Sequence, residues 1–347
     1  MELAQMLAGM RFSNVDIDFT QKCNLRCKHC YAEAGPEAPD ELTTAELKDL
    51  VDQLAAMKTL SVTVGSGGEG MLRPDLLEVL AYVRARGMLA FLVTNGLLLT
   101  PEVAQRLKDL RVVVSVSLDG ATPESHNALR GHPQAFDGAL GAIRLLRRTG
   151  AVTAMNLTLN KLNYHEMPRF LELVRSLGVK YVSINRMIPV GRGVQNTHLL
   201  LNGAEFKQAV HDLREGIGPD VVMSSQDPIL DRMFKTTTRA AGEAKTGVQM
   251  TYACTAGISS FAIKANGDVV PCRMIPVPVG NVRDGPLEQL WAGARFGQEK
   301  DKLAGIWPDP PDPKDPKTWG GCKAVYYFGA PRDPLQGAVR ELLAVGP

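Results

Sequence analysis

Short apolar segments with the length of β-strands alternate with amphipathic segments over the first two thirds of the chain. The strand-like segments cover residues 15–19, 60–64, 89–93, 112–118, 154–159 and 181–185. Between them, apolar residues recur every three to four positions, as in helices that begin near residues 44, 74, 101, 139 and 167. Strands that alternate with helices at this spacing form a parallel sheet with right-handed crossovers. The pattern contains six such strand–helix units and no periodic seventh. It therefore predicts an α/β fold of the partial (β/α)6 TIM barrel type, and an open doubly wound sheet is the alternative.

The alternation stops after Arg192. Residues 195–250 are mixed in pattern and lean toward helix, most clearly over 205–213. Farther on, two short apolar segments flank Asn266-Gly267-Asp268, and an Asn-Gly pair in that position is typical of a β-hairpin turn. We therefore divide the chain into a barrel core, a helical connector and a small C-terminal α+β domain, which cover residues 1–195, 196–250 and 251–347.

The composition is that of an ordinary soluble protein, with 45% hydrophobic and 22% charged residues in a chain of 347. The net charge of +2 argues against a nucleic-acid partner, because proteins that bind nucleic acid usually carry a basic face. The first residues lack the features of a signal peptide, and no apolar run is long enough to span a bilayer. We therefore expect a cytoplasmic protein without a membrane partner. In that compartment its six cysteines are more often metal ligands or catalysts than disulfides.

Three of the cysteines lie within eight residues, between the first expected strand and the helix that follows it. They are Cys23, Cys27 and Cys30, in the pattern Cys-x3-Cys-x2-Cys. The carboxyl end of a barrel strand is where active sites of such folds lie, and a short loop there can point three thiolates at one inorganic group. Three cysteine ligands hold three irons of a [4Fe–4S] cluster and leave the fourth iron open. The alternatives are a zinc site with His29 as fourth ligand, although zinc ligands usually come as two separated pairs, and buried structural cysteines.

This Cys-x3-Cys-x2-Cys segment resembles the signature of the radical S-adenosylmethionine (SAM) superfamily, and the six expected units agree with the partial barrel of that family. The resemblance implies that the open iron binds the amino and carboxylate groups of SAM. One-electron reduction, by a low-potential donor such as flavodoxin or ferredoxin, then cleaves SAM to a 5′-deoxyadenosyl radical that abstracts hydrogen from the substrate. The cofactor would carry this chemistry, while the protein supplies geometry and excludes water.

Other strand ends also match the pattern of the family. Gly67-Gly68-Glu69 follows the second expected strand, where the Gly-Gly-Glu motif of the family holds the amino group of SAM, although Gly70 stands where proline is usual. His29 occupies the slot beside adenine and is expected to be a packing residue. The backbone of residues 185–193, which include Met187, is expected to lie against adenine. The resemblance assigns further cofactor contacts to five residues at or near strand ends, Asn95, Ser117, Asp119, Arg130 and Asn185. For these residues, capping of the strand ends is an equal alternative.

The other three cysteines are Cys254, Cys272 and Cys322. The expected hairpin would bring the first two together, and a returning segment can supply the third. The arrangement resembles the SPASM extension and its shorter twitch form, which carry auxiliary [4Fe–4S] clusters. Because Trp319 and Leu335 stand where the full SPASM pattern has further cysteines, we expect one auxiliary cluster, whose fourth iron is open or bound by another ligand. Three unrelated buried cysteines are the alternative.

All six cysteines are thereby assigned to clusters, and this bears on the reaction. A radical epimerase typically needs a spare thiol to return a hydrogen atom, and only Tyr252, Tyr326 or Tyr327 would remain for that role. We therefore expect an oxidoreductase that performs a dehydrogenation or forms a bond on a small-molecule or peptide substrate, in natural-product, peptide or cofactor biosynthesis. Arg186 and Arg192 either meet a substrate carboxylate or pair with surface carboxylates, which is slightly favoured. A non-catalytic zinc or iron–sulfur protein is the alternative of a different class.

Overall fold

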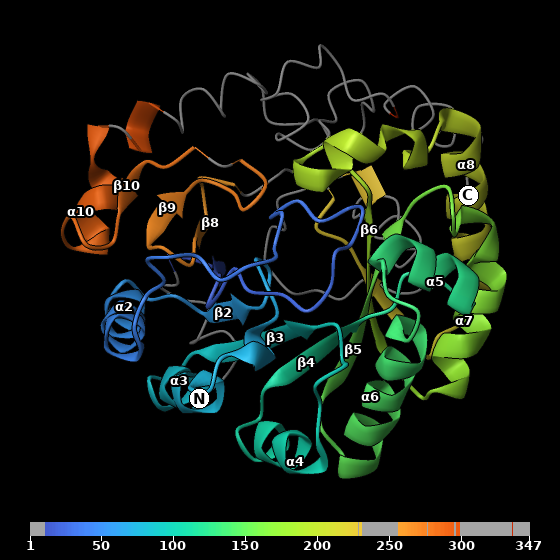
Figure 1. Ribbon diagram of the computed structural model, residues 1–347, viewed down its shortest axis with the longest axis horizontal. Coiled ribbons are helices and arrows are strands. Elements are labelled where there is room, and N and C mark those ends of the chain that lie inside the picture. Colours follow the sequence, from blue (N-terminus) through green and yellow to red (C-terminus); the bar gives the residue numbers. More distant parts are fainter. Residues whose placement is uncertain are drawn as a thin grey trace.

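A curved sheet with helices on its outer side forms the frame of the molecule (Figure 1). The computed structural model describes residues 11–227, 229–230, 256–275, 277–294, 296–298 and 335. The strands in chain order are β1 (Asn14–Ile17), β2 (Ser61–Val64), β3 (Leu89–Thr94), β4 (Val113–Ser117), β5 (Thr153–Leu159), β6 (Tyr181–Arg186), β7 (Val222–Ser224), β8 (Ser260–Ile263), β9 (Asp268–Val270) and β10 (Gly280–Asn281). The α-helices are α2 (Thr44–Ala56), α3 (Leu76–Ala85), α4 (Pro101–Asp109), α5 (Pro123–Arg130), α6 (Ala135–Thr149), α7 (Met167–Ser176), α8 (Gly203–Gly216) and α10 (Leu287–Ala292). Three 3-10 helices are η1 (Gly70–Leu72), η2 (Tyr164–Glu166) and η3 (Gly191–Leu199).

The strands β1 to β6 lie side by side in chain order, and each pairs in parallel with the next. This confirms the predicted partial barrel with a further C-terminal part. The sheet extends beyond the six predicted strands at both edges, because β7 pairs in parallel with β6 and β8 pairs in parallel with β1. The pattern of the connector did not reveal β7, since its three residues are largely exposed and the apolar run at its start, 221–223, is too short to indicate a strand. The hairpin of β8 and β9 is confirmed, with Gly267 at a φ of 90° in its turn.

The helices begin where capping chemistry allows it. The side chain of Thr43 accepts the Glu46 N–H and Glu46 bonds back to the Thr43 N–H, which completes the expected capping box of α2. The hydrophobic spacing alone did not predict α5, but Thr122 caps it and Pro123 occupies its first turn, which is a start signal in the sequence. α6 begins at Ala135, four residues before the expected start, because Ala135 and Phe136 are already buried.

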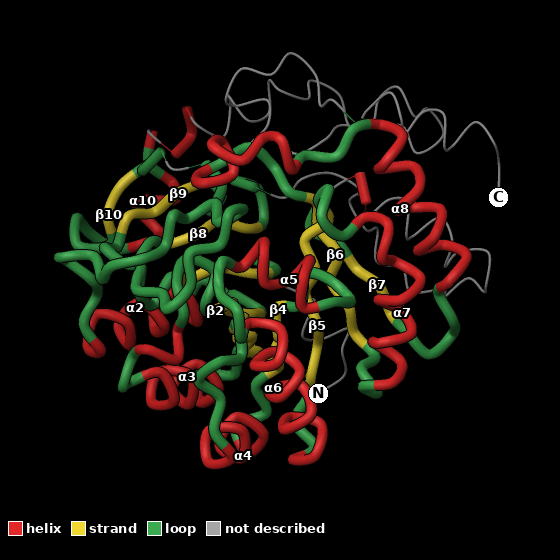
Figure 2. Tube along the Cα trace, turned by 45° about the vertical axis from the view of Figure 1, so that its right-hand side comes forward, coloured by secondary structure: helices red, strands yellow, loops and turns green. Residues whose placement is uncertain are grey.

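The two faces of the sheet differ in chemistry. Along β5, buried and half-buried residues alternate, and the buried set, such as Met155 and Leu157, belongs to the core under the helices. The alternate residues face the side of the sheet that the red helices of Figure 2 leave uncovered. Their neighbours across β6 are polar as well, since Asn156 pairs with Ser183. Near the carboxyl ends of β5 and β6 the inner wall of the barrel is therefore polar and only half-buried. No helix in the described part is long and apolar enough to cross a membrane.

Candidate functional site

The cysteine loop, residues 23–30, leaves the carboxyl end of β1. The Cys23 N–H donates to Gly35 O at 2.8 Å and fixes the start of the loop. Cys27 is buried, Cys23 and Cys30 are half-buried, and all three are free thiols. The loop thus presents three thiols at the end of the barrel where active sites of this fold lie.

The three thiols share one poorly solvated environment. Burial raises the pKa of the Cys23 thiol to about 11 and also raises that of Cys27, and the charge of Cys30 acts in the same direction. Among the described residues, no three Cys, His, Asp or Glu side chains gather around one point as the ligands of a single metal ion do. The three thiols are close enough for their charges to influence one another, which fits a [4Fe–4S] cluster, in which each thiolate binds its own iron.

A buried ion pair lies behind the loop. Arg130 Nε is 2.6 Å from Asp119 Oδ2, and the Asp119 side chain is inaccessible to solvent. Arg130 Nη1 is also 3.8 Å from Cys27 Sγ. Burial, the largest single influence, favours the neutral carboxyl group, but Arg130, the two histidines nearby and the Thr158 N–H together outweigh it, and the pKa of Asp119 is lowered. Asp119 therefore holds the Arg130 cation beside Cys27. There the cation opposes the rise that burial causes in the pKa of the Cys27 thiol.

His29 lies at the edge of this ion pair, with its Nε2 3.8 Å from Asp119 Oδ2. Burial lowers its pKa to about 4, with a further contribution from Arg130, so the ring is neutral near pH 7. Its Nδ1 is buried and has no hydrogen-bond partner within the described ranges. An enclosed imidazole with a pKa of about 4 is a weak base, so His29 fits a packing role better than that of a general base.

The glycines of Gly67-Gly68-Glu69 allow this segment to lie directly on the chain that enters the cysteine loop. A Cβ on Gly68 would lie 2.5 Å from Thr20 O and 2.6 Å from Lys22 O, closer than a side chain can approach. The Glu69 N–H donates to the same Lys22 O at 2.9 Å. Glycine is therefore required for the contact between the second strand end and the loop.

The carboxylate of Glu69 is buried among donors. It accepts from Thr94 Oγ1 at 2.9 Å, from the Asn95 N–H at 2.9 Å and from the Met71 N–H at 3.3 Å. Burial raises its pKa although these bonds oppose the shift. A carboxylate has roughly four acceptor positions, so capacity for one more donor remains. Asn95 also reaches the cysteine loop, because its Nδ2 donates to Asn24 Oδ1 at 2.7 Å.

Gly191 and Arg192, shortly after β6, support the loop from its other side. A Cβ on Gly191 would lie 2.4 Å from Tyr31 O and 2.6 Å from Cys30 O. The Arg192 N–H donates to Cys30 O at 3.0 Å, and its Nε donates to Cys27 O at 2.8 Å. Arg192 therefore anchors the loop through carbonyl groups, a role that differs from both alternatives considered from the sequence.

Replacing Gly191 with alanine should loosen the loop, because residue 191 has a φ of 56° and no room for a Cβ. We expect a loss of about 1–3 kcal/mol from the backbone conformation, with the clash in addition. Urea unfolding of the metal-free protein and the iron content after reconstitution measure the two effects. Gly141→Ala is the control, since no atom lies within 4 Å of a Cβ there and alanine should stabilise α6 slightly. Equal behaviour of the two variants would contradict the supporting role of Gly191.

The remaining predicted contacts lie at the end of β4 and in or just after β6. Ser117 is buried at the end of β4. The Oδ1 of Asn185 accepts the Gln226 N–H at 2.8 Å, which ties β6 to the segment after β7. Met187 is buried in a small apolar cluster with Leu129. The cysteine loop itself is contacted directly by Asn95 and Arg130, whereas Asn185 and Met187 are engaged in local packing.

Arg186 is likewise internal. Its Nε lies 2.5 Å from Asp227 Oδ2, and both side chains are 5% exposed. This ion pair joins β6 to the residues after β7. Arg186 therefore pairs with a carboxylate, as the sequence analysis favoured, but the pair is buried and does not lie on the surface.

Of the second cysteine set, Cys254 and Cys322 lie outside the described residues, as do the three tyrosines considered as hydrogen donors. Cys272 is half-buried and directly precedes Arg273. The guanidinium of Arg273 donates from Nη1 to Asp16 Oδ1 at 3.1 Å and lies 5.8 Å from the ring centre of Tyr31. Because Tyr31 follows the last cysteine of the loop, this contact joins the loop to the segment of Cys272.

The sequence analysis did not single out Arg273 or its partner Asp16. A signal was present in β1, where Asp16 and Asp18 alternate with apolar residues. Two carboxylates on one face of a strand that is otherwise buried require cations or donors nearby. Arg273 and Lys264 fill that requirement, the latter with its Nζ 3.7 Å from Asp18 Oδ2.

Two family profiles match the chain in the regions just described. The profile of the radical SAM superfamily matches residues 17–174, and that of SPASM, an iron–sulfur cluster-binding domain, matches residues 254–314. The first match contains the cysteine loop and five of the barrel units. The chain therefore belongs to the radical SAM superfamily and has a SPASM-type C-terminal region. Membership implies a SAM-binding [4Fe–4S] cluster, SAM itself and auxiliary iron–sulfur binding.

Relatives cover most of the chain. It is 32% identical to the AdoMet-dependent heme synthase of Methanosarcina barkeri (strain Fusaro / DSM 804), over 89% of this chain and 90% of that protein. It is 31% identical to the mycofactocin maturase MftC of Mycobacterium tuberculosis (strain CDC 1551 / Oshkosh), over 92% of this chain and 77% of that protein. The solved structure of anSMEcpe with bound AdoMet and Kp18Cys peptide shares the fold, with a TM-score of 0.74, 16% identity and coverage of 95% of this chain and 96% of that chain.

Proposed function

We propose that this radical SAM enzyme is an oxidoreductase that removes hydrogen from a small-molecule or peptide substrate, and that the reaction ends in dehydrogenation or a new bond. The observation that carries the proposal is the cysteine loop, with three free thiols and the Arg130 cation 3.8 Å from Cys27 Sγ. Two relatives are named for biosynthesis, a heme synthase and a maturase, which supports a role in cofactor, peptide or natural-product biosynthesis. A fold relative with a peptide bound supports a peptide as one substrate class.

In this proposal Cys23, Cys27 and Cys30 hold the [4Fe–4S] cluster. The cluster, when bound, supplies the electron that cleaves SAM to a 5′-deoxyadenosyl radical. The chain contributes the environment: Arg130 balances the thiolate charge at Cys27, and the acceptor position left on Glu69 can receive the ammonium group of SAM. The packing of Gly68 and Gly191 against the loop keeps its backbone in one place, as positioning of reactants requires.

The C-terminal region completes the proposal. Cys254, Cys272 and Cys322 would hold one auxiliary cluster, so that no thiol is left to return a hydrogen atom to the substrate. Oxidation of the substrate radical is then favoured over epimerisation. We also retain three proposals from the sequence: the division at residues 195 and 250, a flavodoxin or ferredoxin as electron donor, and the cytoplasm as the compartment where the thiols stay reduced.

Anaerobic reconstitution with iron and sulfide, followed by addition of a reductant and SAM, tests the proposal. We expect about eight irons per chain for two cubes, and 5′-deoxyadenosine as a product. About four irons, unchanged by Cys254→Ala, would contradict the auxiliary cluster. Zinc without 5′-deoxyadenosine would contradict the enzyme activity. Solvent deuterium retained on carbon in an otherwise unchanged product would point to an epimerase instead of an oxidoreductase.

A further inference from the structure

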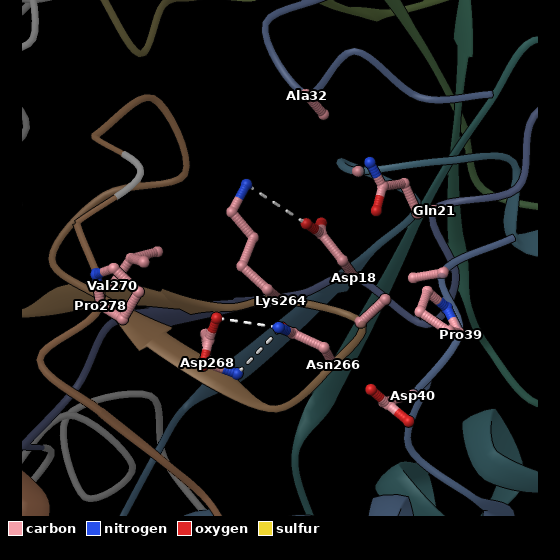
Figure 3. A pocket seen from close by; sticks show the side chains of 13 residues that line it. Asp18, Gln21, Ala32, Pro39, Asp40, Lys264, Asn266, Asp268, Val270 and Pro278 are labelled. Atoms are coloured by element: carbon pink, nitrogen blue, oxygen red, sulfur yellow. Dashed lines mark hydrogen bonds and ion pairs between the residues drawn. The ribbon is translucent and has the colours of Figure 1, made fainter. Parts of the chain in front are cut away.

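A pocket of about 360 Å³ lies between the cysteine-loop segment and the hairpin of β8 and β9 (Figure 3). Ala32 lines it two residues after Cys30, and Gly67 brings the Gly-Gly-Glu segment into its wall. Lys264 enters from the end of β8. The pocket therefore adjoins the SAM site from the side of the C-terminal region, and no residue role proposed so far uses it.

The charges in the pocket wall are unequal, with three carboxylates against one ammonium group. Asp268 is already paired, because Asn266 and Asn281 donate their Nδ2 groups to it at 2.8 and 3.0 Å. Asp40 lies at the exposed rim. Asp18 remains as the deep carboxylate, and it determines what the pocket can bind.

Asp18 is 4% exposed, and its Oδ1 has no hydrogen-bond partner in the described part of the chain. The cation Lys264 approaches its other oxygen at 3.7 Å, beyond hydrogen-bond length. Figure 3 draws these two side chains and the ion pair between them. Burial raises the pKa of Asp18 to about 6, although Lys264 lowers it, so the group is mostly ionised at pH 7. A buried carboxylate oxygen without a donor is costly unless a ligand supplies one.

Gly67 leaves the space beside the Asp18 carboxylate free of a side chain. A Cβ on Gly67 would lie 2.2 Å from Asp18 Cγ and 2.6 Å from Oδ1, so any side chain would occupy the place in front of the carboxylate. The glycine that the family resemblance assigned to SAM therefore also forms the wall beside Asp18.

We propose that this pocket binds a primary ammonium group of the substrate, with Asp18 as its partner. The proposal rests on the proposed function and narrows the substrate to an amine, such as a peptide N-terminus or a lysine side chain. An anion is disfavoured by the excess of carboxylates. The pocket volume is at the lower end of ligand sites, which suits one end of a substrate while the remainder reaches toward the cysteine loop.

Saturation-transfer NMR on the reconstituted, SAM-loaded enzyme tests this, with n-butylamine as probe and butyrate as its anionic counterpart. We expect a signal for the amine and none for butyrate. Asp18→Asn should weaken the amine about ten- to a hundredfold, because a charge-assisted hydrogen bond is lost. Asp49→Asn is the control, since Asp49 is exposed on α2 and, among the described residues, its side chain bonds to Gln53 alone.

The Lys264→Met variant should change the affinity for the amine in the opposite direction. It therefore tests the proposal independently of the Asp18 variant. The loss of Lys264 raises the pKa of Asp18 further, so the comparison is made at pH 8.5, where the carboxylate stays ionised and the amine stays protonated. There, removing the competing cation should strengthen the amine several-fold if Asp18 binds it, and should weaken any anion. Binding of butyrate in preference to the amine, or weaker amine binding in Lys264→Met, would overturn the proposal. Displacement of SAM by the amine would also overturn it, because the pocket would then be the site of the SAM amino group. These outcomes are distinct from failure of the proposed function, which shows as absence of 5′-deoxyadenosine in the wild-type enzyme.

Discussion

The Cys27→Ala variant should form no 5′-deoxyadenosine above background and should lose about four irons per chain after reconstitution. Cys27 is the most enclosed of the three loop thiols, at 7% exposure, and Arg130 Nη1 lies 3.8 Å from its sulfur. With two thiolates left, a [4Fe–4S] cluster would have two irons without a protein ligand, and the cube is not retained. Iron and sulfide analysis, the absorbance of the cluster and product analysis after reduction measure the outcome.

Cys272→Ala is the matched control, since it removes an equally plausible iron ligand from the C-terminal region. It should lower the iron content by a similar amount while SAM cleavage remains measurable, because the loop cluster is untouched. If Cys27→Ala keeps a full set of irons and cleaves SAM, the assignment of the loop thiols is wrong. If Cys272→Ala behaves like Cys27→Ala in every respect, the two cysteine sets do not form separate sites.

Most of the barrel could be predicted from the sequence, because its strands are buried and its helices amphipathic. The six strands β1 to β6 are predominantly apolar on the face that packs under the helices, and this is what a periodic pattern records. β7 escaped prediction because its pairing with β6 is made by backbone groups of largely exposed residues. β8 was foreseen as part of a hairpin, but nothing in its sequence indicates that it continues the sheet beside β1.

The position of the candidate site could be predicted from the sequence, but most of the hydrogen bonds and ion pairs within it could not. The three cysteines and Gly67-Gly68-Glu69 lie together as expected, because the carboxyl ends of parallel strands share one edge. Which polar residues bind each other was not visible, since those pairs are far apart in the sequence. Arg192 reaches the carbonyl of Cys27 across 165 positions, and only the folded chain brings the two together.

The buried ion pair of Asp119 and Arg130 should contribute strongly to the free energy of unfolding. Arg130→Met should destabilise the metal-free protein by about 3–5 kcal/mol, because it leaves the Asp119 carboxylate buried without its cation. Methionine fills most of the volume, so loss of packing contributes little. Equilibrium urea unfolding under reducing conditions, in the absence of iron and SAM, measures the change.

The double variant Arg130→Met with Asp119→Asn separates charge from shape. Asparagine keeps an acceptor for the Thr158 N–H, which donates to Asp119 Oδ1 at 2.7 Å, and removes the uncompensated charge. The double variant should therefore be more stable than Arg130→Met alone. A single variant within about 1 kcal/mol of the wild type would show that the pair is not structural. Because neither cluster nor SAM is present in this experiment, the loss belongs to the ion pair itself. Any additional loss of SAM cleavage in the conservative Arg130→Lys variant, once its stability is matched, then measures what the cation does for the thiolate of Cys27.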